Sequence, residues 1–167
     1  MIWKTLPRSE LVDGLWGHVA GSGPDLVLIH GVGLRAEAWG ALIPLLSPYF
    51  TVHAVDMPGH GASPALASAG LDAYSARITA YIGMLGGAYV AGHSMGAMIA
   101  MDICGRSPSL VKGVAALNAI YRRTPDAAVA VQARAADLQA AGSHDPLPTL
   151  SRWFDNLQSP AAVACRE

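Results

Sequence analysis

Residues 88–98 read AYVAGHSMGAM and combine three local patterns. The apolar run at 88–91 predicts a buried strand, and residues 95–106 have apolar positions at helical spacing before Pro108. Between them, GHSMG at 92–96 matches G-x-S-x-G, a strained strand-to-helix turn that exposes a serine hydroxyl. The flanking glycines leave room where side chains would collide with backbone. We therefore predict Ser94 as a catalytic nucleophile; the plainer alternative is an ordinary helix-entry turn.

The segments on either side of this turn predict an alternation of strands and helices. Residues 11–20 suggest an antiparallel hairpin, and apolar runs predict strands at 25–30, 50–56 and 111–117. Helical spacing marks 36–46, where Pro44 weakens the pattern, and 71–85. Such alternation indicates an α/β fold with a mostly parallel sheet flanked by helices.

The character of the chain changes after Asn118. Residues 125–141 are alanine-rich and helical, residues 149–157 predict a short helix, and we predict no further strand. We therefore divide the chain into residues 1–118, which carry the sheet, and residues 119–167, which are helical.

Composition excludes several classes of protein. Of the 167 residues, 52% are hydrophobic and 14% are charged, which excludes a disordered chain. The net charge of −1 lacks the basic excess of a nucleic-acid binder. We see no signal peptide and no apolar run long enough for a membrane span. Two cysteines fit a reducing compartment, so we predict a cytoplasmic protein. The cysteines and histidines do not have the spacing of metal ligands, so we predict no metal site.

Two further motifs follow the first two predicted strands. HGVG at 30–33 is a glycine-rich loop, and we predict that the N–H groups of Val32 and Met95 form an oxyanion hole for a tetrahedral intermediate. One such donor is typically worth about 3–4 kcal/mol. DMPGHGAS at 56–63 we interpret as structural, since Asp56 precedes the nucleophile in the chain.

Together these three motifs resemble the α/β-hydrolase family over about residues 10–120, most closely small bacterial carboxylesterases and lactonases. The resemblance implies an α/β-hydrolase fold, a Ser–Asp–His triad, no cofactor, and a helical cap after the strand near Asn118. Residues 119–167 would then be the start of that cap.

The acid and base of the triad have no obvious place in this sequence. The family order is Ser, Asp or Glu, then His, on later strands that are not predicted here. Asp137 and His144 have the right order but fall in a predicted helix and turn. We expect the acid and base to lie outside this sequence. The strand at 111–117 would then be an unpaired edge of the sheet. We therefore predict a chain that is marginally stable, aggregation-prone or completed by a C-terminal partner chain.

A serine nucleophile also narrows the chemistry. Relatives that act on alkyl halides or epoxides carry aspartate there, so Ser94 favours a small acyl substrate: an ester, lactone or thioester. Carbon–carbon bond hydrolysis of diketones and cofactor-free perhydrolysis stay open. Trp39 and Tyr121 are candidates to line the substrate pocket, with core packing as the alternative for Trp39. The rival function is a non-catalytic binding protein or remnant of the same fold.

Overall fold

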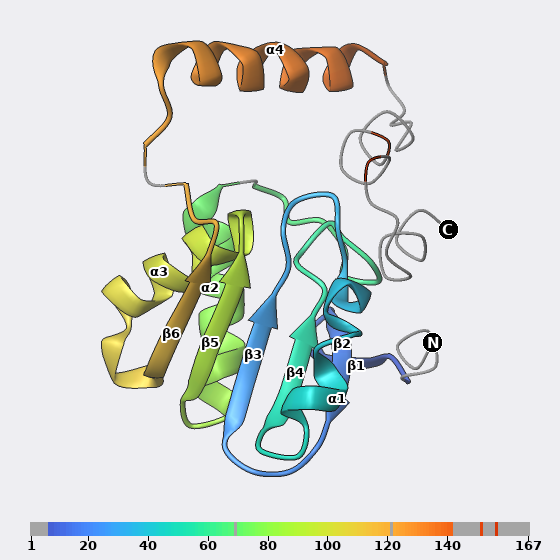
Figure 1. The fold of residues 1–167 in the computed structure, drawn as a ribbon, viewed down its shortest axis with the longest axis vertical. Coiled ribbons are helices and arrows are strands. Elements are labelled where there is room, and N and C mark those ends of the chain that lie inside the picture. The colour runs from blue at the N-terminus through green and yellow to red at the C-terminus, as the bar shows by residue number, and fades with distance from the viewer. Residues whose placement is uncertain (1–6, 69, 121, 142–150, 152–155, 157–167) are drawn as a thin grey trace. The chain divides into compact units, whose positions relative to one another are not determined.

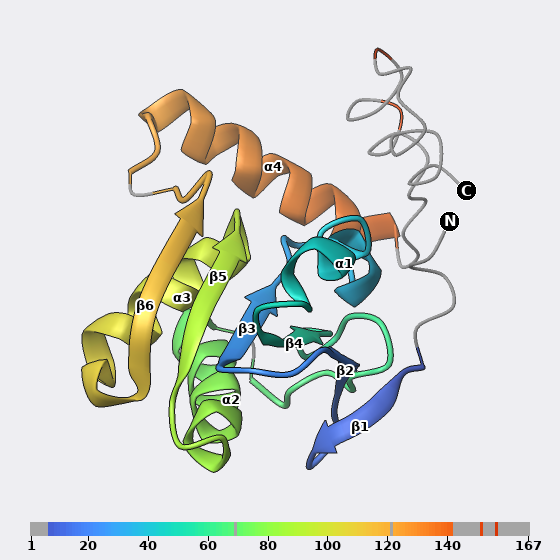
Figure 2. The ribbon, with the colours of Figure 1, turned by 60° about the horizontal axis from the view of Figure 1, so that its bottom comes forward.

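The computed structural model describes residues 7–68, 70–120, 122–141, 151 and 156. Six strands form one sheet in the order β1-β2-β4-β3-β5-β6, with β1 and β6 at its edges (Figure 1). The strands are β1 (Ser9–Val12), β2 (Leu15–Ala20), β3 (Asp25–Ile29), β4 (Thr51–Val55), β5 (Ala88–His93) and β6 (Val111–Leu117). β4, β3, β5 and β6 run parallel, and the β1–β2 hairpin joins β4 antiparallel, as Figure 2 shows. The predicted hairpin and mostly parallel sheet are confirmed.

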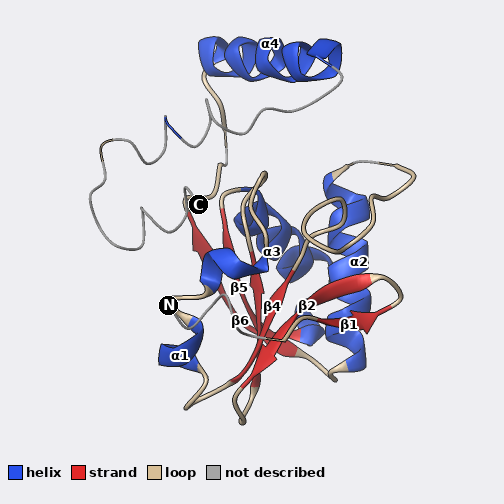
Figure 3. Ribbon diagram, turned by 90° about the vertical axis from the view of Figure 1, so that its right-hand side faces the viewer, coloured by secondary structure: helices blue, strands red, loops and turns tan. Residues whose placement is uncertain are grey.

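Helices cover both faces of this sheet. They are η2 (Ala36–Trp39), α1 (Ile43–Leu46), α2 (Leu71–Met84), α3 (Met95–Arg106) and η3 (Pro108–Leu110). Figure 3 shows α1 on one side of the sheet and α2 and α3 on the other. Each side has its own apolar cluster: Ile78, Ile82 and Ile99 are fully buried under α2 and α3, and Trp39 and Ile43 pack under η2 and α1.

The single helix predicted over residues 36–46 is wrong, because the segment divides into η2 and α1. Gly40 caps η2, and Pro44 lies in the first turn of α1. Proline is tolerated there because the first-turn N–H groups have no partner within the helix. Inside a continuous helix the same proline would remove a hydrogen bond and clash with the preceding turn.

The edge strand β6 presents apolar side chains to solvent. Val114 is 44% exposed and Leu117 is 47% exposed. Within the described part of the chain β6 pairs with β5 only, as the predicted free edge requires. Beside it, Phe50, Tyr89 and Val114 line a shallow apolar groove that reaches across β5 toward β3.

Backbone contacts divide the chain into two compact units, residues 1–120 and residues 121–167. The second unit contains α4 (Pro125–Ala141), as predicted from its alanine-rich pattern. Tyr121, His144 and most of the helix predicted at 149–157 lie outside the described residues. None of the helices in the ranges described above is both long and apolar enough to cross a membrane.

Candidate active site

Ser94 stands in a strained turn between β5 and α3. Its backbone has φ 56° and ψ −113°, a combination that side-chain-bearing residues rarely adopt. Such a conformation costs about 1–3 kcal/mol and is held only where the surroundings over-determine it. Here the Ser94 N–H donates to the carbonyl of Leu117 at 2.9 Å, which ties the turn to the end of β6. Strain at this serine is the geometric signature of a nucleophile elbow.

Both glycines of the motif are required for space. A Cβ on Gly92 would lie well under 3.0 Å from the carbonyl oxygen of Gly96, in the first turn of α3. A Cβ on Gly96 would lie equally close to the carbonyl oxygen of Ile29 at the end of β3. Any side chain at either position would therefore push α3 away from the sheet.

The loop after β3, residues 30–35 (the β3 loop), lies beside the nucleophile. A Cβ on Gly31 would lie 3.2 Å from Nδ1 of His93 and 3.4 Å from Cβ of Ser94, so the loop backbone passes directly beside the serine. The loop turns at residues 31–34, where the Leu34 N–H donates to the Gly31 carbonyl at 3.2 Å and Gly33 has φ 77°. This positive φ is the third-position value of a type II turn.

The two predicted oxyanion donors lie on the elements expected for them. Val32 is at the tip of the turn in the β3 loop and is 55% exposed. Met95 is the first residue of α3, where the N–H has no acceptor within the helix. Their use as a pair toward one oxyanion stays a prediction.

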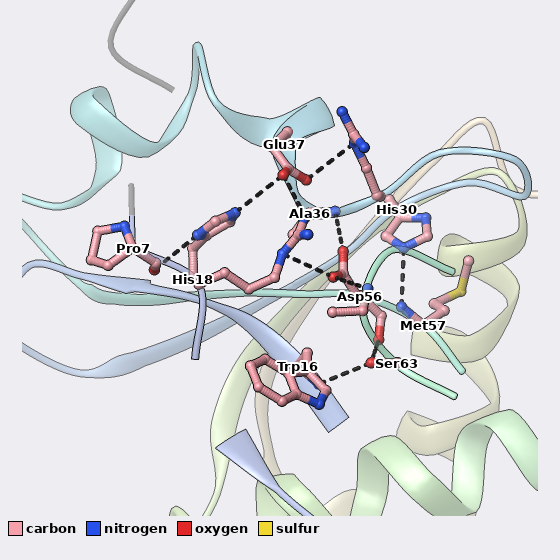
Figure 4. A network of polar contacts seen from close by, with 12 residues as sticks. Pro7, Trp16, His18, His30, Ala36, Glu37, Asp56, Met57 and Ser63 are labelled. Carbon is pink, nitrogen blue, oxygen red and sulfur yellow. Dashed lines mark hydrogen bonds and ion pairs between the residues drawn. The ribbon is translucent and has the colours of Figure 1, made fainter. Parts of the chain in front are cut away.

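His30 joins the β3 loop to the loop after β4, residues 56–63 (the β4 loop). Its Nδ1–H donates to the carbonyl of Gly31 at 2.8 Å, and its Nε2 accepts the N–H of Met57 at 3.0 Å (Figure 4). Burial lowers the pKa of His30 to about 4, because desolvation disfavours the imidazolium form. A neutral ring is also what these contacts require, since Nε2 must keep its lone pair.

Asp56 also connects the β4 loop, through hydrogen bonds, to the start of η2 directly after the β3 loop. Its fully buried carboxylate accepts the N–H of Ala36 at 2.8 Å and the N–H of Ala62 at 2.9 Å, and Nε of Arg8 lies 3.3 Å away (Figure 4). The hydroxyl of Ser63 donates to the Asp56 carbonyl at 2.7 Å. These contacts agree with the structural interpretation of the motif and leave the carboxylate no free face for a reacting group.

A charged cluster around Glu37 had no signal in the sequence. Its carboxylate contacts the guanidinium of Arg8, and it lies 3.5 Å from Nε of Arg35 and 3.7 Å from Nε2 of His18 (Figure 4). The partners come from β2, from the β3 loop and from the segment before β1. Arg35 is two residues from Glu37 in the chain, but only folding brings Arg8 and His18 to it, so no spacing along the chain could indicate those two contacts.

The remaining candidates are placed less favourably for a substrate site. Trp39 is only 8% exposed and belongs to the apolar cluster under η2 and α1, which favours the packing alternative over a pocket wall. Tyr121 and His144 lie outside the described residues, and Asp137 is an exposed residue of α4. Across the described ranges, no group of three or more His, Cys, Asp or Glu side chains is placed to hold a metal ion.

A mostly parallel sheet with a strained serine between an interior strand and the next helix defines the class of α/β proteins built on a nucleophile elbow. Comparison with known families agrees: the model of the "Alpha/beta hydrolase family" matches residues 26–166. The chain belongs to this family.

The relatives that this chain resembles include hydrolases and methyl ester esterases. The chain is 44% identical to an (E)-2-((N-methylformamido)methylene)succinate hydrolase of Acinetobacter baylyi, over 92% of this chain and 59% of that protein. It is 40% identical to a pimeloyl-[acyl-carrier protein] methyl ester esterase of Chromobacterium violaceum, over 60% and 39% respectively. The solved structure of E-2-(acetamidomethylene)succinate hydrolase superposes with a TM-score of 0.77 at 26% identity, over 94% and 61%. The chain thus spans about three fifths or less of these relatives.

Proposed function

We propose that this chain carries the nucleophile and oxyanion hole of a serine hydrolase that cleaves a small carboxylic ester, lactone or thioester. The strained backbone of Ser94 is the observation that supports this most directly. Oγ of Ser94 attacks the acyl carbonyl and gives up its proton to a base. The N–H groups of Val32 and Met95 stabilise the oxyanion, the protonated alcohol or thiol leaves, and water then hydrolyses the acyl-enzyme.

The names of the relatives narrow the class of substrate. Two of them act on methylene-succinate derivatives, which bear carboxylates, and another acts on a methyl ester. We propose a small anionic acyl compound as the substrate. Because the first-named relative is 44% identical over most of this chain, carboxylate-bearing substrates deserve testing first.

Serine at its ordinary pKa is a weak nucleophile, and we propose that a second polypeptide supplies its base. The exposed edge of β6, with Val114 and Leu117, supports a C-terminal partner chain that adds a strand and supplies the Asp and His. We further propose that residues 119–167 begin a helical cap and that the protein is cytoplasmic. The competing proposal is a non-catalytic binding protein, which would need no base beside Ser94.

Labelling with a fluorophosphonate probe tests these proposals, because the probe reacts only with an activated serine. The chain is labelled alone and after co-expression with the C-terminal part of the Acinetobacter baylyi relative that this chain does not cover. Ser94→Ala removes the nucleophile, and Ser109→Ala, at an exposed serine in η3, is the matched control.

Each outcome has a distinct meaning. Labelling of the chain alone that is lost only in Ser94→Ala shows that a base is present within it. Labelling that requires the second polypeptide supports a two-chain enzyme. If the folded chain is not labelled in either setting, the hydrolase proposal is wrong and the binding protein takes its place.

A further inference from the structure

His60, in the β4 loop, makes a second bridge to the β3 loop. Its Nε2 accepts the N–H of Gly33 at 3.1 Å, and its Nδ1–H donates to the carbonyl of Pro58 at 3.2 Å. The bond to Pro58 holds the ring within its own loop and leaves Nε2 unprotonated. His60 is thus an acceptor aimed at the backbone of the β3 loop.

The hydrogen bonds of His30 and His60 connect the same two loops in opposite directions. His30 belongs to the β3 loop and accepts an N–H from Met57 of the β4 loop, whereas His60 belongs to the β4 loop and accepts an N–H from Gly33 of the β3 loop. The two rings also contact each other edge to face, with centroids 5.2 Å apart and planes at 62°. Both rings therefore use the Nδ1–H tautomer, and each one limits the motion of the other.

These two bridges fix the peptide groups on either side of Val32. The Gly31 carbonyl and the Val32 N–H belong to one planar trans peptide and point in opposite directions, so the bond from His30 to Gly31 sets the direction of the Val32 N–H. The Val32 carbonyl and the Gly33 N–H form the next peptide, which His60 holds.

The peptide between Val32 and Gly33 needs a restraint because Gly33 is flexible. Its φ is 77°, its backbone is exposed, and a Cβ added to it would have no neighbouring atom within 4 Å, so few contacts restrict this residue. Glycine populates many conformations, so a turn that depends on it is easily rearranged. The imidazole of His60 supplies the missing restraint.

We propose that His60 is a positioning residue of the oxyanion hole, which with His30 clamps both peptides that flank Val32. The proposal rests on the proposed function of Val32. A hydrogen bond to the carbonyl of a peptide also polarises its N–H, so the clamp orients the donor and strengthens it before substrate binds.

Three variants separate this role from simple stability. His60→Phe keeps a ring but loses the acceptor, and His60→Gln places an amide oxygen where Nε2 was. His53→Phe is the matched control, because His53 is a more deeply buried histidine that bonds Tyr81 and Asp25 at 2.8 and 2.9 Å, away from both loops.

Two spectroscopic readouts require no activity. In the wild type, ring ¹⁵N shifts should show the Nδ1–H tautomer at both His30 and His60, and an Nε2–H tautomer at His60 refutes the clamp without any variant. Hydrogen exchange of the Gly33 amide should be about fivefold to tenfold faster in His60→Phe and close to wild type in His60→Gln. Unchanged exchange in a folded His60→Phe also overturns the proposal.

Labelling of Ser94 by the fluorophosphonate then tests the link to chemistry. We expect the maximal rate to fall about tenfold in His60→Phe with little change in the probe concentration at half-maximal rate, and to recover in His60→Gln. An equal fall in folded His53→Phe would refute a positioning role. If the wild type is not labelled, the proposed function fails, and tautomer and exchange still decide whether the clamp exists.

Discussion

Acid should destabilise this fold through His30 in particular. The pKa of the buried ring is lowered to about 4, from an ordinary 6.5 in the unfolded chain. Protonation adds a hydrogen to Nε2, which faces the N–H of Met57 at 3.0 Å, so two donors would then confront each other in a buried site. The unfolded chain accepts the proton more readily than the folded one.

The size of the effect follows from the two pKa values. The difference between 6.5 and about 4, at about 1.4 kcal/mol per pH unit, corresponds to about 3 kcal/mol of unfolding free energy. The sign follows from linkage: this stability is fully present above pH 6.5 and is lost as the pH falls toward 4. Since small domains are stabilised by only about 5–15 kcal/mol, a loss of this size is readily measured.

Urea unfolding at a series of pH values from about 7.5 to about 4 provides the measurement, with His30→Gln as the comparison. Glutamine has a donor and an acceptor but does not titrate in this range. The variant should be less stable than the wild type near neutral pH, and the gap should shrink by about 3 kcal/mol toward the acid end. Parallel pH dependences in the two proteins would refute the role given to His30.

Three further substitutions test the geometry of the site. Gly96→Ala should destabilise the fold by about 1–3 kcal/mol, because its Cβ would overlap the carbonyl of Ile29. The control Gly105→Ala, in open space on the same helix, should be neutral or stabilising by up to about 1 kcal/mol. Urea unfolding of both variants measures the difference. Ser94→Gly should abolish fluorophosphonate labelling yet raise the unfolding free energy by about 1 kcal/mol, since glycine relieves the strained φ, and a destabilised variant would contradict the strain. Asp56→Asn should cost about 1–3 kcal/mol, because an amide cannot accept both backbone N–H groups, and a variant as stable as the wild type in a thermal melt would remove Asp56 from its structural role.

Local patterns in the sequence were enough to predict most elements of the sheet. β6 and α3 coincide with predicted segments, because apolar periodicity and the glycine and proline at their ends act within a few residues. The prediction of one helix over 36–46 was wrong, because it followed the apolar spacing alone. Gly40 and Pro44 have conformational preferences that override this spacing and divide the segment.

The candidate nucleophile could also be located from sequence, because G-x-S-x-G encodes a backbone conformation and not only a side chain. Ser94 needs a positive φ and glycine neighbours that leave room for other backbone segments, and both requirements are written within five residues. The sequence did not decide whether Trp39 packs in the core or lines a pocket, since an apolar ring near a loop suits both places. Its burial in the folded protein favours the core.

The sequence by itself therefore determined the family, the individual strands of the sheet and the candidate nucleophile, because each of them is encoded by a few residues close together in the chain. Only the tertiary structure decided how the candidate oxyanion loop is held. His30 and His60 lie in different loops, and each accepts a backbone N–H from the other's loop: His30 from Met57 and His60 from Gly33, 27 residues apart in both pairs. Such bonds depend on which parallel strands become neighbours, and β4 and β3 meet only once the sheet has formed.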